Sequence, residues 1–472
     1  MRIGAIVAAA AILVLLAYEV AHGTKRTIAV GFLVAVLIPL SVAAIERPLL
    51  FPFGLYVILA PFESILQIGG YGTINKMVGI VTFLAVLFLL ARRGQLVKPS
   101  ASVLVWLALV IWMGLSGFWT LDQQNWQAAY LTLAQNFILY ALVSLVIATP
   151  ADIEILSSCA VIGGLAASAV AIWPLVTGGE ILTAGARITL FAGNGPGGEH
   201  ADPNVFAASL LLPFAILFSS TLASRGIGSL LGNIAGLGLI VVTIVVTGSR
   251  AGMLAMLVMT LFIVFAKPRG RILGLGLVVL AGLLMLPFGF DIQNRWANAI
   301  SSGGAGRTDI WQVGMLAFQQ HWLFGWGYGS FEAAFDRFVL QAPLTSYISW
   351  HRAPHDILLE TGVDLGVFGV LFVAIAFFVQ FRDLALPRVG GFLDDLRVAL
   401  QATILGLCID ALFLDFLDAK FLWILFTLIA LTRSTIVAKR RTACVAPPSR
   451  TLGPVSAQPR SSALSSRLKT DG

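Results

Sequence analysis

Charged side chains are scarce in this chain, and their scarcity excludes a soluble globular protein. Only 11% of the 472 residues are charged, whereas a soluble domain carries about 25%. Hydrophobic residues make up 58% of the chain, and apolar runs of membrane-spanning length recur from end to end. The sequence therefore predicts a polytopic membrane protein.

Cysteine is nearly absent, and its few positions indicate no disulfide framework. Cys159 and Cys408 lie within apolar runs, and Cys444 lies in the tail. The net charge of +7 does not indicate a nucleic-acid partner, because basic residues after position 438 supply nearly all of it. We expect this basic tail to lie beside the lipid bilayer and expect no nucleic acid to bind.

Metal-binding patterns are also missing. No Asp-x-Asp motif occurs in the chain. His351 and His355 have the four-residue spacing of a helical metal pair, but Pro354 argues against one helix through both. We predict neither a metal nor a cofactor.

What the sequence has in abundance is spanning segments. They predict an all-α fold, a membrane bundle of about 12–14 transmembrane helices, at 3–21, 27–45, 49–66, 77–90, 101–118, 127–148, 153–176, 201–222, 227–247, 251–266, 272–289, 354–380, 393–413 and 418–433. A signal peptide is the alternative for the first run, but no convincing Ala-x-Ala site follows it. We therefore interpret it as the first spanning helix.

The spans divide the chain into four parts. Residues 1–289 are N-terminal transmembrane helices, 290–353 a large loop with two short amphipathic helices, 354–438 C-terminal transmembrane helices and 439–472 a disordered tail. Lys and Arg in short loops place the N-terminus and the tail in the cytoplasm, with Lys25 and Arg26 as exceptions. The loops 177–200 and 290–353 are then extracytoplasmic.

Three arginines fall on that extracytoplasmic side: Arg187, Arg250 and Arg307. An arginine at a membrane edge is costly unless it snorkels or finds an anionic partner. Guanidinium groups bind phosphate oxygens in a bidentate way and stay charged at any pH. The three together suit a pyrophosphate-linked lipid. The seven glycines of 177–200 form either an anion-binding backbone or a flexible connector, and the sequence leaves both open.

His355 follows Pro354 at the start of a predicted spanning helix. A helix N-terminus disfavours imidazolium, so a neutral imidazole is expected there. Such a group can act as general base for a sugar hydroxyl, although a histidine at a helix start is also often structural.

Further polar residues are candidates to support these groups: His200, Asn204, Asp356 and Glu360. His200 and Asn204 flank Asp202 and Pro203, which fit the cap and first turn of the helix at 201. Glu360 and Asp364 lie on one face of the helix after Asp356. They either orient His355 or an arginine, or pair for structural reasons.

Five short motifs between about 200 and 370 occur together and in order. They are Asp202-Pro203-Asn204-x-x-Ala207, Gly248-Ser249-Arg250-Ala251-Gly252, Gly306-Arg307-x-x-x-Trp311, His321-x-Leu323-Phe324-Gly325-Trp326-Gly327-x-Gly329-Ser330-Phe331 and Pro354-His355-Asp356. In this set the chain resembles the O-antigen ligase and O-antigen polymerase superfamily of bacterial envelope proteins. It departs from the family's usual residues at Trp322, where proline is common, and at Asp356, where Asn or Ser is common.

The resemblance implies a metal-independent, inverting glycosyltransferase of the bacterial inner membrane. Such enzymes move a glycan from undecaprenyl pyrophosphate to a glycan or lipid acceptor outside that membrane. Carried over by motif, Arg250 and Arg307, and more weakly Arg187, would bind the pyrophosphate, and His355 would activate the acceptor hydroxyl. Ligase, polymerase and protein O-glycosylation remain open. A polysaccharide or lipid transporter is the alternative from another class, although no internal repeat supports it.

Overall fold

The computed structural model describes residues 46–63, 65–68, 72–178, 187–190, 202–267, 271–272, 274–276, 307–342, 344 and 350–445. The predicted spans at 3–21 and 27–45, most of the one at 272–289, and the tail after residue 445 lie outside these residues. Most of the glycine-rich loop and His200 lie outside them too.

The helices and strands of the described residues are all helices apart from one pair of two-residue antiparallel strands, which confirms the all-α class. Its elements are α3 (Phe53–Leu59), η1 (Ala60–Phe62), β1 (Gln67–Ile68), β2 (Gly72–Thr73), α4 (Ile74–Arg93), α5 (Ala101–Leu115), η2 (Ser116–Phe118), α6 (Gln123–Ser144), α7 (Pro150–Thr177), α8 (Pro203–Ser209), α9 (Leu211–Ala223), α10 (Ile227–Val246), α11 (Arg250–Ala266), α14 (Arg307–Gln320), α15 (Phe331–Phe338), η5 (Val339–Gln341), α16 (Ile357–Asp383), α17 (Phe392–Asp410) and α18 (Lys420–Val445). Among the described residues, 7 helices are long and apolar enough to cross a membrane. The chain is a multi-pass membrane protein.

Each predicted span within the described residues contains a helix, but two of them are broken. The span at 201–222 divides into α8 and α9 at Leu210. Pro213, in the first turn of α9, has no N–H to donate to the carbonyl of Ser209, so one continuous helix is disfavoured there. The span at 354–380 is interrupted at Gly366, whose φ of 69° is left-handed. At the other end, α18 runs to Val445, so residues 439–445 are helical rather than part of a disordered tail.

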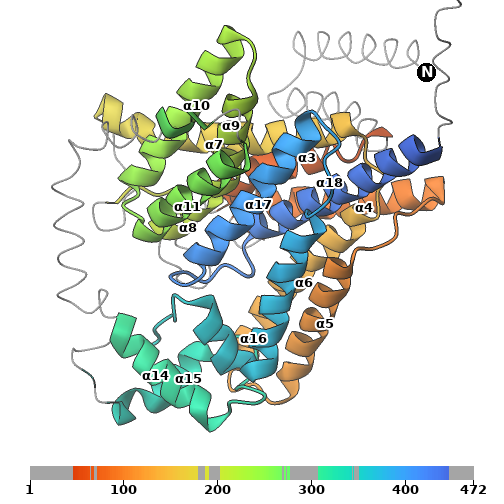
Figure 1. The fold of residues 1–472 in the computed structure, drawn as a ribbon. Helices are drawn as coiled ribbons and strands as arrows, with labels where there is room; N and C mark the ends of the chain where they lie inside the picture. The colour runs from red at the N-terminus through yellow and green to blue at the C-terminus, as the bar shows by residue number, and fades with distance from the viewer. Residues whose placement is uncertain are drawn as a thin grey trace, which may run out of the picture.

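The bundle packs α17 against α11 and α9, and α16 against α5 (Figure 1). An aromatic cluster fills the space between α5, α6, α16 and α18, with Trp106 at its centre. Its ring centroid lies 5.1 Å from those of Trp423 and Phe426 and 6.1 Å from that of Phe377. Trp106 is completely buried, and the ring of Tyr140 on α6 lies 5.8 Å from that of Trp423, so the rings join the four helices into one core.

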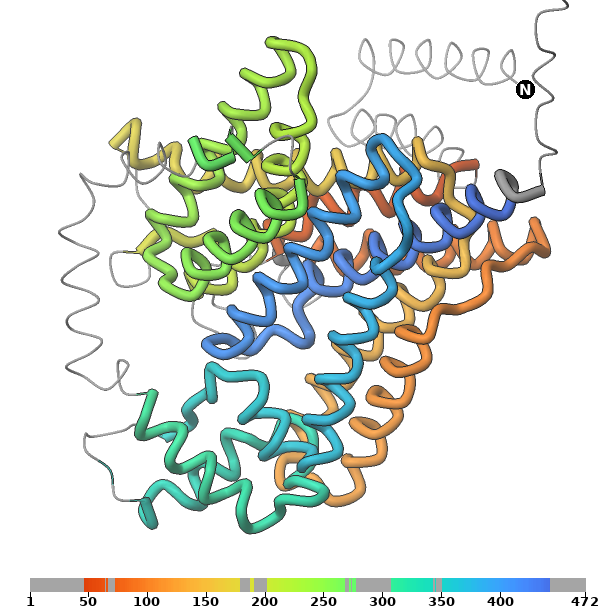
Figure 2. Tube along the Cα trace, viewed as in Figure 1, coloured from red at the N-terminus to blue at the C-terminus, as the bar shows by residue number. Residues whose placement is uncertain are grey.

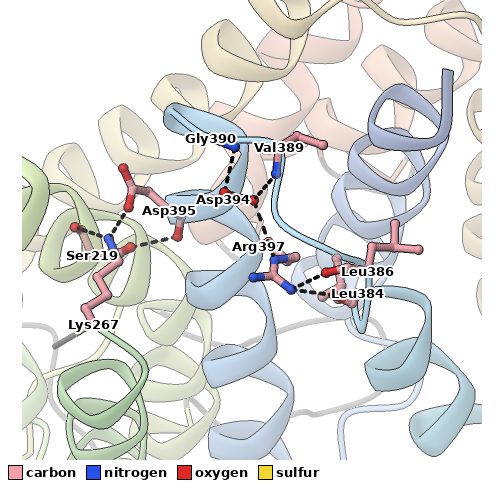
Figure 3. A network of polar contacts seen from close by, with 9 residues as sticks. All are labelled: Ser219, Lys267, Leu384, Leu386, Val389, Gly390, Asp394, Asp395 and Arg397. Atoms are coloured by element: carbon pink, nitrogen blue, oxygen red, sulfur yellow. Dashed lines mark hydrogen bonds and ion pairs between the residues drawn. The ribbon is translucent and has the colours of Figure 1, made fainter. Parts of the chain in front are cut away.

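One end of the bundle, which we call the basic end, is fastened by half-buried ion pairs (Figure 3). Lys267, at the end of α11, donates to the Asp395 carboxylate at 2.6 Å and to the Ser219 carbonyl at 2.8 Å. In the same network Arg397 donates to the Leu386 carbonyl at 2.6 Å. These contacts tie α9, α11 and α17 to the loop between α16 and α17.

The opposite end carries a separate lobe, the cap, made of residues 307–342 and the first part of α16, 357–365. Figures 1 and 2 show α14 and α15 as a lobe below the main bundle, with α16 and the α5–α6 pair reaching down to it. The face of α15 that carries Phe331, Phe335 and Phe338 is buried in the cap. The two short amphipathic helices predicted for the large loop are therefore present as α14 and α15.

The glycine-rich turn at 325–330 docks on the break in α16. Trp326 N donates to the Val363 carbonyl and Gly327 N to the Asp364 carbonyl, both at 2.8 Å. The Asp364 carboxylate accepts from Gly329 N at 2.6 Å and Ser330 N at 3.1 Å. The role of Asp364 is thus structural, but its partners are the backbone amides of this turn rather than another side chain.

We expect Gly366→Ala to destabilise the protein. A Cβ at this position would lie 2.2 Å from the Leu323 carbonyl oxygen, and the left-handed backbone alone costs a non-glycine residue about 1–3 kcal/mol. Gly238→Ala on α10 is the matched control, because nothing lies within 4 Å of its added Cβ. Thermal unfolding in detergent should show a lower Tm for the first variant only. Equal Tm values would show that the docking does not need this backbone.

Candidate functional site

Arg187 joins two of the motifs found in the sequence. Its Nε donates to the Thr247 carbonyl at 2.8 Å, directly before Gly248-Ser249-Arg250. One of its terminal nitrogens donates to Asn204 Oδ1 at 2.7 Å, and Asn204 N in turn donates to Asp202 Oδ1 at 2.7 Å. The segment around Arg187, the start of α8 and the α10–α11 turn therefore meet in one place.

Arg250 and Arg307 are each the first residue of a helix. Arg250 begins α11, whose N-cap Ser249 accepts a hydrogen bond from Gly252 N at 3.2 Å, and Arg307 begins α14. Both side chains are half-buried. The N-terminus of a helix carries partial positive charge and bare N–H groups, so the position of Arg250 adds to the attraction for an anion.

The two arginines and several carboxylates influence one another. Burial lowers the pKa of the Arg307 guanidinium, and the charge of Arg250 lowers it further, while Asp202, Asp410 and Asp415 oppose both effects. Since arginine nevertheless stays protonated, the cluster holds cationic groups close together in a half-buried place. The three carboxylates offset part of this positive charge.

The backbone presents His355 at a bend just before α16. Its φ is 49°, in the left-handed region that few non-glycine residues adopt. On one side Trp311 Nε1 donates to the Pro354 carbonyl at 3.2 Å. On the other side the Asp356 carboxylate caps α16 by accepting from Leu358 N at 2.8 Å and Leu359 N at 3.0 Å. The tryptophan of the Arg307 motif and Asp356 thus fix the histidine between them.

The surroundings of His355 favour its neutral form. Burial lowers the pKa of the imidazole, Asp415 raises it, and Arg307 lowers it. His355 Nδ1 lies 4.0 Å from Asp415 Oδ1, too far for a hydrogen bond, and its side chain is 31% exposed. A neutral, accessible imidazole is able to accept a proton near neutral pH, even with the Arg307 side chain nearby.

Two residues of this cluster were not identified from the sequence. Asp410 ends α17 and is fully buried, and Asp415 lies in the loop between α17 and α18. Ile357 N donates to the Ala411 carbonyl at 2.9 Å, which brings this loop to the start of α16. The available signal was a loop between the last two spans with aspartates at 410, 415 and 418, on the same side as the arginines.

The other predicted residues lie as follows. Asn204 contacts Arg187, and Asp356 caps α16. Glu360 is half-buried in the first turn of that helix. His351 pairs with Asp336 on α15, with Nδ1 2.7 Å from Oδ2. Within the described parts of the chain, no group of His, Cys, Asp and Glu is arranged to hold a metal ion.

Fold and geometry together define a multi-pass helical membrane protein with a cluster of arginines, aspartates and a half-buried histidine and with a cap at one end of its bundle. Residues 235–374 match the model of a protein family described as O-Antigen ligase, which covers α11, the cap and most of α16. The match confirms the resemblance to the O-antigen ligase superfamily. This family implies a glycosyltransferase-like ligase or polymerase with lipid-linked glycan and acceptor substrates. No curated protein matches the chain.

We expect the pKa of His355 to lie below 6.5 and to fall further in Asp415→Asn, because that change removes the carboxylate that raises it. Diethyl pyrocarbonate modifies only the neutral imidazole, so its rate at His355, followed by mass spectrometry against pH, reports the value. Asp418→Asn, in the same loop, is the control and should leave the profile unchanged. A profile that moves to higher pH in Asp415→Asn would contradict this account.

Proposed function

We propose that this protein transfers a glycan from undecaprenyl pyrophosphate to an acceptor hydroxyl, as an O-antigen ligase-like enzyme, at the extracytoplasmic face of the bacterial inner membrane. The observation that carries the proposal is the convergence of Arg187, Arg250, Arg307 and His355. They come from four separate segments of the chain and meet at the cap end. The family assignment supplies the class of reaction, and the site supplies the roles.

The arginines suit the pyrophosphate of the donor. Arg250 adds a guanidinium to the N-terminus of α11, and Arg307 adds a second guanidinium beside it, which suits a diphosphate rather than a neutral sugar. Arg187 uses two of its donors on Thr247 and Asn204, so its first role is to hold the Arg250 turn in place. The charge of its guanidinium adds to the attraction for the same anion.

His355 suits the acceptor. The acceptor oxygen attacks the anomeric carbon from the face opposite the pyrophosphate and forms the new glycosidic bond. The bond from that carbon to the pyrophosphate oxygen breaks, and its electron pair leaves with undecaprenyl pyrophosphate. The hydroxyl proton passes to His355, through Nε2, since Nδ1 faces Asp415. The arginines stabilise the charge that develops on the leaving group, so no metal is required for it.

The distribution of cations supports the sidedness. Lys267, Arg382, Arg397 and Arg433 lie at the basic end, and the site lies at the cap end. Positive residues in short loops mark the cytoplasmic side of membrane proteins. The basic end is then cytoplasmic, and the site faces outward, where a lipid-linked glycan awaits transfer.

We expect substitutions of the arginines to weaken donor binding and a substitution of His355 to slow turnover. A hydrogen bond to a charged group is worth about 1.5–3 kcal/mol, so Arg250→Ala and Arg307→Ala should weaken donor binding about ten- to a hundredfold. Lysine at either position should rescue only in part, because it keeps the charge and loses the fork. His355→Ala should bind donor normally and transfer about 10²–10⁴ times more slowly. The measurements are lipid-pyrophosphate affinity and single-turnover transfer.

Two variants serve as matched controls for this pattern. Arg225→Ala removes an exposed arginine between α9 and α10, and His351→Ala removes the histidine paired with Asp336. Both should bind and transfer as the unaltered protein does. If His355→Ala transfers at the normal rate, or loses donor affinity as the arginine variants do, the assigned roles are wrong.

We also expect transfer to proceed without divalent metal. The chain has no Asp-x-Asp motif, and the charge of the leaving group is assigned to guanidinium groups. Purified protein in EDTA should transfer at the rate seen with added Mg²⁺ or Mn²⁺. Loss of transfer in EDTA with recovery on adding either metal would rule out the metal-free mechanism.

A further inference from the structure

Four aromatic side chains are exposed where the cap meets the bundle, in two segments joined by the rings of Trp119 and Phe324, whose centroids lie 6.4 Å apart. Phe118 and Trp119 lie at the end of η2, and Trp322 and Phe324 lie in the turn after α14. Phe118 is 88% exposed and Trp322 is 56% exposed. We call these four residues the aromatic rim. Neither the site nor the proposed reaction uses them.

The aromatic rim rests on packed rings rather than projecting singly. The ring of Trp112 on α5 lies 5.6 Å from that of Trp119 and 5.8 Å from that of Phe324. Phe324 lies 5.9 Å from Phe368, which follows the break in α16. These contacts hold one side of the rim against α5 and α16 while the other side stays uncovered.

The uncovered side continues apolar faces that run along two spanning helices. On α5 the exposed residues are Leu104, Leu107, Ile111 and Leu115, and on α16 they are Phe368, Leu371, Ile375 and Phe378. Both helices are long and apolar enough to cross a membrane, so these faces meet lipid chains. The rim lies where the two faces end, at their cap side.

The height of the rim agrees with the thickness of a bilayer. The apolar segment Ala101–Phe118 has 18 residues, which span about 27 Å as a helix. The hydrocarbon core of a bilayer is about 30 Å thick. If Ala101 lies at one boundary of the hydrocarbon, Phe118 and its neighbours reach the other.

We propose that the aromatic rim sits in the phospholipid headgroup layer on the cap side and fixes the height of the cap above the hydrocarbon. Tryptophan is favoured in that layer because its ring is largely apolar while its N–H remains able to bind lipid carbonyls. Phe324 immediately precedes the turn that docks on Gly366 and Asp364. The lipid contact therefore steadies the same turn that joins the cap to α16.

The test is a measurement of depth. Cys159, Cys408 and Cys444 are replaced by alanine, and single cysteines at Phe118 or Trp322 carry a nitroxide in the full chain reconstituted in phosphatidylglycerol and phosphatidylethanolamine vesicles. The ratio of collision rates with oxygen and with nickel-EDDA rises with depth in the bilayer. Gln341, exposed on the cap, is the water control, and Leu371, on the lipid face of α16, is the bilayer control.

Labels at both rim positions should give ratios between those of the two controls. Ratios equal to that at Gln341 would show that the rim is in water and would overturn the proposal. Dipolar broadening between labels on two copies would also overturn it, because a second protein chain would then cover the rim. The readout needs no glycan transfer, so it stands or falls independently of the proposed function.

Discussion

The hydrogen bonds between the Asp364 carboxylate and the backbone amides of Gly329 and Ser330 hold this structure's cap in place. They join the turn at 325–330 to the one point where α16 departs from helical geometry, and Gly366 makes that departure possible. The turn also receives the α5–α6 connection, since Leu121 N donates to the Trp326 carbonyl at 3.0 Å. The two amides satisfy both oxygens of a buried carboxyl group, which suits a junction that bears a whole lobe.

The position of His355 follows from that junction. Helix α14 is part of the cap, and its Trp311 donates a hydrogen bond to the carbonyl of Pro354, the residue before the histidine. The histidine in turn lies beside Asp415 and within the influence of Arg307, the first residue of α14. Arg307 and His355, which we propose to bind the donor and to accept the proton, therefore share the cap as a support. In an enzyme of this class both must be placed to within a fraction of an ångström relative to the bond that breaks.

Much of this could be predicted from the sequence, for identifiable reasons. Apolar runs report burial in lipid directly, so the spans at 101–118 and 227–247 appear as α5 with η2 and as α10. Motifs read in order indicated the family and brought Arg187, Arg250, Arg307 and His355 forward as candidates. The two amphipathic helices of the large loop were visible in the spacing of residues such as Phe331 and Phe335.

What could not be predicted depends on contacts between distant segments. Gly366 looks like any glycine in a spanning helix, because the carbonyl of Leu323, which leaves no room for a Cβ there, lies more than forty positions away in the chain. The sequence left open whether Asp364 supports His355 or has a structural role. In the structure its carboxylate accepts hydrogen bonds from the amides of Gly329 and Ser330. Asp410 and Asp415 follow the last motif and join the site only because their loop meets the start of α16. Tertiary placement, rather than local pattern, decides all of these roles.

The central claim is that the cap-end cluster transfers glycan rather than moves it across the membrane. Purified protein in sealed vesicles, with lipid-pyrophosphate glycan and acceptor on the cap side, tests this most directly by mass spectrometry of all lipid products. The account predicts one glycosylated acceptor for each undecaprenyl pyrophosphate released, with inverted anomeric configuration. Intact donor appearing in the opposite leaflet, with no acceptor modified, would contradict it.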